Sequence, residues 1–269
     1  MDVSIVIVSF NARDDLGRCL QTLTNTPPTR SHEILVVDNA SVDGSADEAR
    51  RWPGVRVIET GENLGFAHGT NIGIRASGGA NILLLNSDAL VPAGAIDRLI
   101  DELDRRRDVA VVGPRLVDSE GRAEPSFGRM VGPVNELRQK RLMRGYDARQ
   151  PDILARVERA TQQEQFPDWV SGACLLVRRA DAEAVGLLDE RYFMYLEDVD
   201  FCAAIRARGR RVLFTPGVQV VHLRGQSVKS AAASTGRAYR RSQLAFYAKH
   251  HPAWVPLLRL YLRLRGADR

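Results

Sequence analysis

The chain has 269 residues, 44% hydrophobic and 26% charged, which is typical of a globular protein of one large or two small domains. This composition excludes a disordered, collagen-like or repeat protein. The three cysteines, Cys19, Cys174 and Cys202, form no CxxC pair. They therefore predict neither a disulfide framework nor a zinc knuckle, and they favour a reducing compartment.

The formal net charge of +5 is unevenly distributed. Residues 231–269 hold eight Lys or Arg and one acidic residue, a local charge of +7, which leaves −2 on the rest of the chain. We therefore expect no nucleic-acid-binding surface on the body of the protein. The first residues lack the basic segment of a secretory signal, and no apolar run approaches the ~20 residues that span a bilayer. These features predict a cytoplasmic protein, either soluble or peripheral on the inner face of the plasma membrane.

Strands and helices alternate along the first part of the chain. Residues 3–9 are β-branched and apolar, as in a central parallel strand buried on both faces. Leu16, Leu20 and Leu23 then recur at helical spacing, with Asn11 or Asp14 as the expected N-cap. Further strands are predicted at 33–37, 55–59, 81–85 and 109–112, and further helices at 45–51, 64–76 and 93–107. This order predicts a doubly wound parallel sheet with a nucleotide site at the carboxyl ends of its strands.

The pattern changes at residues 118–167, which are polar, Arg-rich and interrupted by Gly and Pro. We predict a mobile insertion there with one or two helices. Regular structure is expected to return with a strand at 169–177, a helix at 197–208 ended by Gly209, and strands at 211–214 and 218–222. Residues 224–237 predict a flexible loop. The expected organisation is one domain, residues 1–230, followed by a basic amphipathic helical tail, residues 231–269.

Two common phosphate-binding motifs are missing from the sequence. Ser9-Phe10-Asn11-Ala12-Arg13 stands where GxGxxG would follow the first strand, and GxxxxGK[ST] occurs nowhere. NAD-linked and P-loop chemistry therefore lose their main support.

The predicted strand ends carry polar residues instead, which should converge on one edge of the sheet: Ser9, Asn11, Asp38, Asn63, Asn86 and Asp88. A carboxylate at Asp38 suits a pyrimidine N3–H or a ribose, although Asp-Asn before Ser is also a common turn. A carboxylate at Asp88 suits a hard divalent cation that bridges a diphosphate, although it could also cap the helix expected near Pro92.

Taken together, these segments resemble the family-two inverting glycosyltransferases of the GT-A fold. The resemblance extends to the rhamnosyltransferase-like enzymes that build bacterial cell-surface polysaccharides. It covers roughly residues 3–230 and is carried by SIVIVSFN (4–11), VVDNASVDGS (36–45), NLGFA (63–67) with Asn71, LNSD (85–88), WVSGA (169–173), YLEDVDFC (195–202) and His222. The joint occurrence of these motifs is far more specific than any one of them.

The resemblance implies an α/β fold of the GT-A type: a Rossmann-like, mostly parallel central sheet flanked by helices, a C-terminal acceptor-side subregion and a helical tail. Within the catalytic domain, residues 1–117 would bind the nucleotide sugar and residues 168–230 would hold the acceptor and the catalytic groups. The implied donor-binding residues are Ser9, Asn11, Asp38, Asn63, Asn71, Asn86 and Asp88.

The same resemblance implies roles for the acidic and metal-binding positions. Asp198 would be the catalytic base and Glu197 a contact to sugar hydroxyls, while Asp200 would lie at the surface. Asn86 replaces the first Asp of the usual Asp-x-Asp pair, so only Asp88 can act as an anionic ligand. His222 would complete the site with Asp88 for Mn²⁺ or Mg²⁺, unless it is a structural strand-end histidine.

The implied reaction is a single in-line displacement with inversion. dTDP-rhamnose is the first expected donor, ahead of UDP-galactofuranose and UDP-hexoses, and the acceptor would be a lipid-linked glycan or a polysaccharide. The alternatives are a nucleotidylyltransferase, a catalytically silent sugar-binding scaffold, and nucleic-acid binding by the basic tail. Trp169 would either stack on an acceptor sugar or belong to the core. The tail would either lie in an anionic membrane interface or pack on the catalytic domain or a second subunit of an oligomer.

Overall fold

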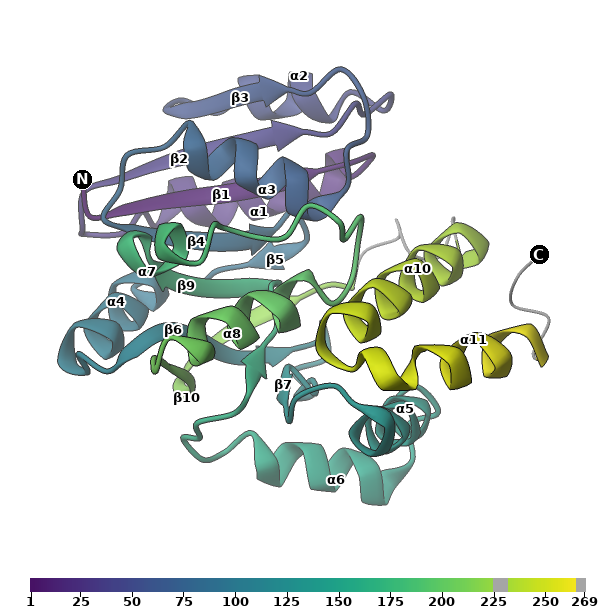
Figure 1. The fold of residues 1–269 in the computed structure, drawn as a ribbon. Coiled ribbons are helices and arrows are strands. Elements are labelled where there is room, and N and C mark those ends of the chain that lie inside the picture. Colours follow the sequence, from purple (N-terminus) through teal and green to yellow (C-terminus); the bar gives the residue numbers. More distant parts are fainter. Residues whose placement is uncertain (225–231, 265–269) are drawn as a thin grey trace.

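The computed structural model describes residues 1–224 and 232–264 (Figure 1). Its centre is an eight-stranded sheet with the order β3-β2-β1-β4-β9-β6-β10-β5. The strands are β1 (Val3–Ser9), β2 (His32–Asp38), β3 (Val55–Glu59), β4 (Asn81–Asn86), β5 (Ala89–Leu90), β6 (Val109–Val117), β9 (Cys174–Arg178) and β10 (Arg211–His222). β3, β2, β1 and β4 are parallel, and so are β6 and β10; β9 runs antiparallel to both neighbours and β5 to β10. The prediction of a mostly parallel sheet is confirmed.

Helices cover both faces of this sheet because side chains alternate along each strand. Ile5 and Ile7 of β1 pack with α1 (Arg13–Asn25), α2 (Ser45–Arg50) and α4 (Ala95–Arg105). Val6 faces the other way, into a core shared with α3 (Phe66–Arg75), α7 (Arg179–Ala184), α8 (Glu197–Ala207) and the C-terminal helices. The sheet is therefore buried on both sides.

Residues 118–167 contain two helices, as the sequence predicts. After the short strand β7 (Phe127–Gly128) come α5 (Pro133–Asp147) and α6 (Pro151–Ala160), and β7 pairs with β8 (Trp169–Val170). α5 and α6 enclose a small core around Tyr146 and Val157. The mobility expected of this segment stays a prediction.

The C-terminal tail is helical and is fixed to the body of the protein. It consists of α10 (Ala232–His250), the 3-10 turn η1 (Pro252–Trp254) and α11 (Val255–Leu264). Buried Glu136 of α5 accepts hydrogen bonds from Tyr247 (2.6 Å) and Gln243, and buried Asp200 of α8 contacts Lys249 (2.8 Å) and His250 (2.6 Å). Asp200 is therefore not a surface residue.

Several predicted boundaries differ from the structure. The flexible loop predicted up to Arg237 is wrong from Ala232 onward, where α10 begins, and its residues 225–231 lie outside the described residues. The strand expected at 169–177 is divided into β8 and β9, whereas the two expected at 211–222 form one strand with a shift in register between Thr215 and Gln219. Ala12 is the N-cap of α1 and provides no side-chain bond, so neither Asn11 nor Asp14 has that role.

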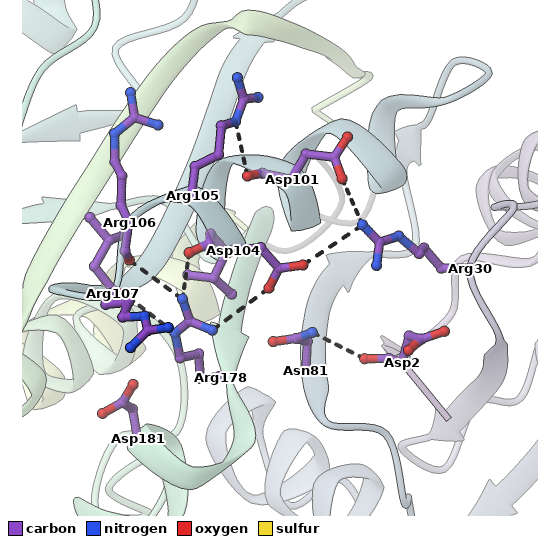
Figure 2. A network of polar contacts seen from close by, with 12 residues as sticks. Asp2, Arg30, Asn81, Asp101, Asp104, Arg105, Arg106, Arg107, Arg178 and Asp181 are labelled. Carbon is purple, nitrogen blue, oxygen red and sulfur yellow. Dashed lines mark hydrogen bonds and ion pairs between the residues drawn. The ribbon is translucent and has the colours of Figure 1, made fainter.

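At the amino edge of the sheet, a charged network ties α4 to β9 and to the segment before β2 (Figure 2). Arg30 contacts Asp101 (2.7 Å) and Asp104 (3.7 Å), and Arg178 contacts Asp104 (3.8 Å). Arg178 also donates to the carbonyl oxygens of Leu103 and Arg106, near the end of α4. These bonds attach the Arg178 side chain of β9 to the C-terminal end of α4.

Candidate active site

The register of the parallel strands brings the polar strand ends together. Ser9 at the end of β1 is paired with Asp38 at the end of β2, and Val8 is paired with Asn86 at the end of β4. The Asn39 N–H also donates to the Ser9 carbonyl oxygen (2.8 Å). The carboxyl edge therefore presents these three predicted residues in neighbouring strands.

Two polar atoms at this edge are buried and have no hydrogen-bond partner among the described residues. They are the Ser9 hydroxyl and Oδ1 of Asp38. The other carboxylate oxygen of Asp38 accepts from the Ser41 N–H (2.9 Å). A role in the turn therefore accounts for one carboxylate oxygen of Asp38 and leaves Oδ1 unexplained. Buried polar groups are nearly always hydrogen-bonded, so two orphaned atoms in adjacent strands indicate a place that a ligand or water completes.

Asn11 and Asn63 border the same edge from exposed loops. Asn11 has a positive φ of 49°, and its side-chain oxygen accepts from the Val42 N–H (2.8 Å). The side-chain oxygen of Asn63 accepts from the Gly65 N–H (3.1 Å) and from the side chain of Asn39 (3.0 Å). Both residues hold loop backbone in place, and both leave their amide NH₂ groups outside these bonds.

Asp88 and His222 meet because β5 pairs with the end of β10. Ala89 is opposite His222, and the Leu223 N–H donates to the Asp88 carbonyl oxygen (2.9 Å). The Asp88 Oδ1 lies 3.3 Å from His222 Nε2, and the two side chains are 14% and 15% exposed. Since α4 begins at Ala95 after Gly94, Asp88 does not cap it.

Glu124, which the sequence analysis does not select, completes this cluster. Its carboxylate lies 3.1 Å from His222 Nδ1 and accepts from Arg224 Nε (2.8 Å), and the side chain is 5% exposed. Burial lowers the pKa of His222, but hydrogen bonds to Asp88 and Glu124 outweigh it and raise that pKa to about 9. Glu124 stands in the polar insertion 118–167, without a motif around it that could have marked it in the sequence.

Asp198 lies in the first turn of α8, and this helix begins directly after two residues in the left-handed region, Tyr195 (φ 70°) and Leu196 (φ 68°). Such strained backbone in non-glycine residues is concentrated at functional sites. The two carboxylate oxygens of Asp198 accept from the N–H groups of Gly172 (2.9 Å) and Val199 (2.8 Å). The turn that contains Gly172 also connects Asp198 to the cluster of Asp88, Glu124 and His222. The Asn86 N–H donates to the Ala173 carbonyl oxygen (3.0 Å), and the Asn86 Nδ2 lies 3.3 Å from His222 Nε2.

Buried Glu197 and half-buried Asp198 form an adjacent acidic pair. Burial raises the pKa of both carboxyl groups, and the charge of Asp198 raises that of Glu197 further, well above its ordinary value of 4.5. The Glu197 Oε2 is also buried without a partner among the described residues. The pair therefore favours one shared negative charge, held on Asp198, where two backbone N–H groups stabilise it.

Two predicted residues lie elsewhere. The Asn71 amide is fully buried; it donates to the Leu188 carbonyl oxygen (2.8 Å) and to Glu190 (2.9 Å), and it accepts from the Leu188 N–H (3.1 Å). Trp169 is 9% exposed in the core and donates its indole N–H to the Arg129 carbonyl oxygen (2.9 Å). The structure supports the core interpretation of Trp169, and it gives Asn71 the role of fixing the backbone at Leu188.

The chemistry of the Asp88 and His222 side chains fits a divalent metal ion. Asp88 Oδ1 and His222 Nε2, 3.3 Å apart, are close enough to bind one ion, and a carboxylate with an imidazole suits Mn²⁺ better than Mg²⁺, which prefers oxygen ligands. Among residues 1–224 and 232–264, no three His, Cys, Asp or Glu side chains form a metal cluster. An ion here would therefore need further ligands from a bound molecule.

Comparison with known proteins agrees with this arrangement. The family model for glycosyl transferase family 2 matches residues 4–182. The chain belongs to this family of glycosyltransferases. An N-acetylglucosaminyl-diphospho-decaprenol L-rhamnosyltransferase of Mycobacterium tuberculosis is 32% identical over 263 residues, which cover 93% of this chain and 85% of that protein. The rhamnosyltransferase WbbL of Escherichia coli K12 is 24% identical over 92% of this chain and 93% of its own length. The glycosyltransferase is therefore rhamnosyltransferase-like, as the resemblance implies.

Solved structures show the same fold. A mannosyltransferase from Pyrobaculum calidifontis, in complex with GDP-Man and Mn²⁺, has a TM-score of 0.64 at 20% identity, covering 96% of this chain and 68% of its own. GalNAc-T7 with UDP, GalNAc and Mn²⁺ has a TM-score of 0.61 at 18% identity, covering 83% and 44%. The expected GT-A fold is confirmed.

Proposed function

We propose that this glycosyltransferase transfers a sugar, with inversion and with a divalent metal ion, from a nucleoside diphosphate donor. L-rhamnose from dTDP-rhamnose is our first choice, and the acceptor is a lipid-linked glycan or a polysaccharide. The observation that carries the proposal is the position of Asn86 between His222 and Asp198. Its backbone N–H donates to the Ala173 carbonyl oxygen (3.0 Å) in the turn that holds Asp198, and its side-chain Nδ2 lies 3.3 Å from His222 Nε2. The names of the two rhamnosyltransferase relatives support the choice of sugar.

The donor is held along the carboxyl edge of the sheet. The orphaned oxygen of Asp38 and the Ser9 hydroxyl face the nucleoside, where a pyrimidine N3–H and a ribose hydroxyl offer the bonds that they lack. Asn11, Asn63 and Asn86 line the path to the diphosphate. Mn²⁺ or Mg²⁺ bound by Asp88 and His222 would offset the negative charge of the departing diphosphate.

Glu124 positions His222 rather than binding the metal itself. Its carboxylate accepts from Nδ1–H of the imidazole (3.1 Å), which turns Nε2 toward Asp88. Arg224 holds the second oxygen of Glu124 (2.8 Å), so the carboxylate cannot rotate away. Carboxylate–histidine contacts of this kind fix the orientation of many metal-binding histidines.

Asp198 acts as the general base in a single displacement. It takes the proton from the acceptor hydroxyl as that oxygen bonds to the anomeric carbon, and the bond from this carbon to the diphosphate oxygen breaks. The two N–H groups that hold its carboxylate keep it oriented and ionised. Glu197 retains a proton beside it and donates a hydrogen bond to a sugar hydroxyl.

A thermal-shift series tests the donor and the metal. Purified protein is heated with dTDP, UDP or GDP and their sugars, each with and without Mn²⁺ or Mg²⁺, because a ligand that binds the native state stabilises it by ~2.7 kcal/mol at a hundredfold excess over Kd. We expect metal-dependent stabilisation that is strongest with dTDP compounds. A stronger response to UDP compounds would move the choice to UDP-galactofuranose or a UDP-hexose, and no response from folded protein would favour a silent scaffold.

Two variants separate the proposed roles. Asp198→Asn should bind donor with unchanged affinity and lose transfer, and His222→Ala should lose the metal-dependent part of the thermal shift. Asp104→Asn, at the opposite edge of the sheet, is the matched control and should change neither. Substantial transfer by Asp198→Asn would exclude Asp198 as the base, and unchanged metal affinity in His222→Ala would exclude His222 as a ligand.

A further inference from the structure

The outer face of α11 is apolar and largely exposed. Leu257, Leu260, Tyr261 and Leu264 recur at the i, i+3, i+4, i+7 spacing of one helix face and are 56%, 54%, 38% and 80% exposed. The helix packs on the body through other positions, mainly Leu258 and Leu262, which are 8% and 6% exposed. The exposed face is therefore not needed for docking of the tail.

α5 exposes a second stripe of similar chemistry. Val134 and Leu137 are 61% and 66% exposed, and the exposed Arg138, Arg141 and Arg144 continue along the same side at helical spacing. The two acidic residues of this helix do not offset the stripe, since Glu136 is buried beneath it and Asp147 pairs with Arg224 (3.4 Å). The stripe is apolar at its start and basic along the rest.

The two helices begin next to each other. The His251 side chain contacts the Val131 carbonyl oxygen (2.8 Å), and its ring lies against Gly132, the residue before α5. Both helices lie at the end of the molecule toward which β1 and β2 point (Figure 1). We call the outer side of η1 and α11 the tail face, and the exposed stripe of α5 begins beside it.

We propose that the tail face binds the surface of an anionic lipid bilayer. Arg259 and Arg263 lie beside the apolar stripe of α11, which has no acidic residue, so apolar insertion and attraction to lipid phosphates act together. Trp254, 46% exposed, adds an aromatic ring of the kind that settles at headgroup level. A second copy of the chain fits less well, because it would bring two basic faces together.

This surface binding would be interfacial. Within the described residues, no helix is long and apolar enough to cross a membrane. The tail is also joined to the catalytic region, since the Ser242 hydroxyl donates to the carbonyl oxygen of Met194 (2.7 Å), shortly before Glu197 and Asp198. A bilayer on the tail face would thus lie on the same side of the molecule as the candidate site, within reach of a lipid-linked acceptor.

Vesicle co-sedimentation of the full chain tests this proposal without donor, metal or acceptor, so its outcome does not depend on the proposed reaction. Vesicles of phosphatidylcholine alone are compared with vesicles that also contain about 30% phosphatidylglycerol, which gives them roughly the surface charge density of an anionic membrane. Leu257→Ser with Leu260→Ser should weaken binding at least ~10-fold, and Arg259→Glu should weaken it only on anionic vesicles. Phe166→Ser, at the ring that lies over Arg211 where β10 begins, and Arg107→Glu, at the amino edge, are matched controls and should bind like the wild type.

Three results would overturn the proposal. One is the absence of binding to anionic vesicles by folded protein. Another is equal binding by the Leu257→Ser, Leu260→Ser variant. The third is a concentration-dependent dimer of the wild type that the same double substitution dissociates, which would assign the tail face to a second copy of the chain.

Discussion

A substitution at Asn71 tests whether this residue stabilises the fold, as its hydrogen bonds indicate, or contacts the donor, as the family resemblance implies. Asn71→Ala removes three hydrogen bonds and leaves the N–H and C=O groups of Leu188 without their side-chain partner in a buried position. Each unsatisfied buried group costs ~1–3 kcal/mol, so we expect the free energy of unfolding to fall by about 2–5 kcal/mol. For a chain of this size, that corresponds to a decrease in Tm of roughly 4–20 °C.

The assay compares stability with donor affinity in the same preparation. Urea titration gives the free energy of unfolding, and a nucleotide titration well below the Tm gives the Kd for the donor nucleotide. Asn71→Ala should lower the first and leave the second within twofold. Glu190→Gln is the matched control: its remaining oxygen still accepts from Asn71 and Arg75, so it should cost less than ~1 kcal/mol.

The opposite pattern would refute this reasoning. If Asn71→Ala unfolds like the wild type but binds nucleotide at least tenfold more weakly, the amide contacts the donor and the family-based prediction holds. Loss of both properties at a temperature where the variant is folded would show that the Leu188 segment itself shapes the donor site.

Two further predictions concern burial. Glu197→Gln should stabilise the protein relative to the wild type, and the difference should grow as pH rises above 4.5. Native Glu197 keeps a proton that the unfolded chain releases above this pH, so the wild type loses stability there and the variant does not. Tm measured against pH for both proteins checks this prediction. Gly73→Ala and Gly236→Ala should have opposite signs in urea titrations. A Cβ at Gly73 of α3 would overlap Val6 of β1 and cost ~1–3 kcal/mol, whereas a Cβ at Gly236 of α10 meets nothing within 4 Å and should gain ~0.5–1 kcal/mol.

The regular elements of the first 117 residues could be predicted because their signals are local. The apolar β-branched run of β1 and the leucines of α1 are each set by burial periodicity, and their observed bounds agree with the sequence to within a few residues. Helix caps were not predictable in this way. Asn11 has the right residue type for a cap, yet the Val42 backbone takes its side chain, and that contact depends on the loop after β2.

The candidate site depends on contacts between distant parts of the sequence. Asp88 and His222 were selectable by motif, but their approach to 3.3 Å requires β5 to turn back against β10. Glu124 carries no motif, and only its position 3.1 Å from His222 distinguishes it from the other acidic residues of the insertion. For Asn71 and Trp169, residue type and family position suggested ligand contacts, whereas burial and hydrogen-bond partners indicate structural roles.

The two edges of the sheet show why partners, rather than residue types, identify the site. At the amino edge, Arg30, Asp101, Asp104 and Arg178 are as polar as any catalytic cluster, but their charges are balanced by one another (Figure 2). At the carboxyl edge, by contrast, the Ser9 hydroxyl and the Asp38 Oδ1 are buried with no partner among the described residues. A folded chain tolerates such costs where a ligand repeatedly removes them. The carboxylates and guanidinium groups named at the amino edge thus satisfy one another, whereas the two unpartnered oxygens of the carboxyl edge lie in adjacent strands, where our proposal places the donor nucleoside.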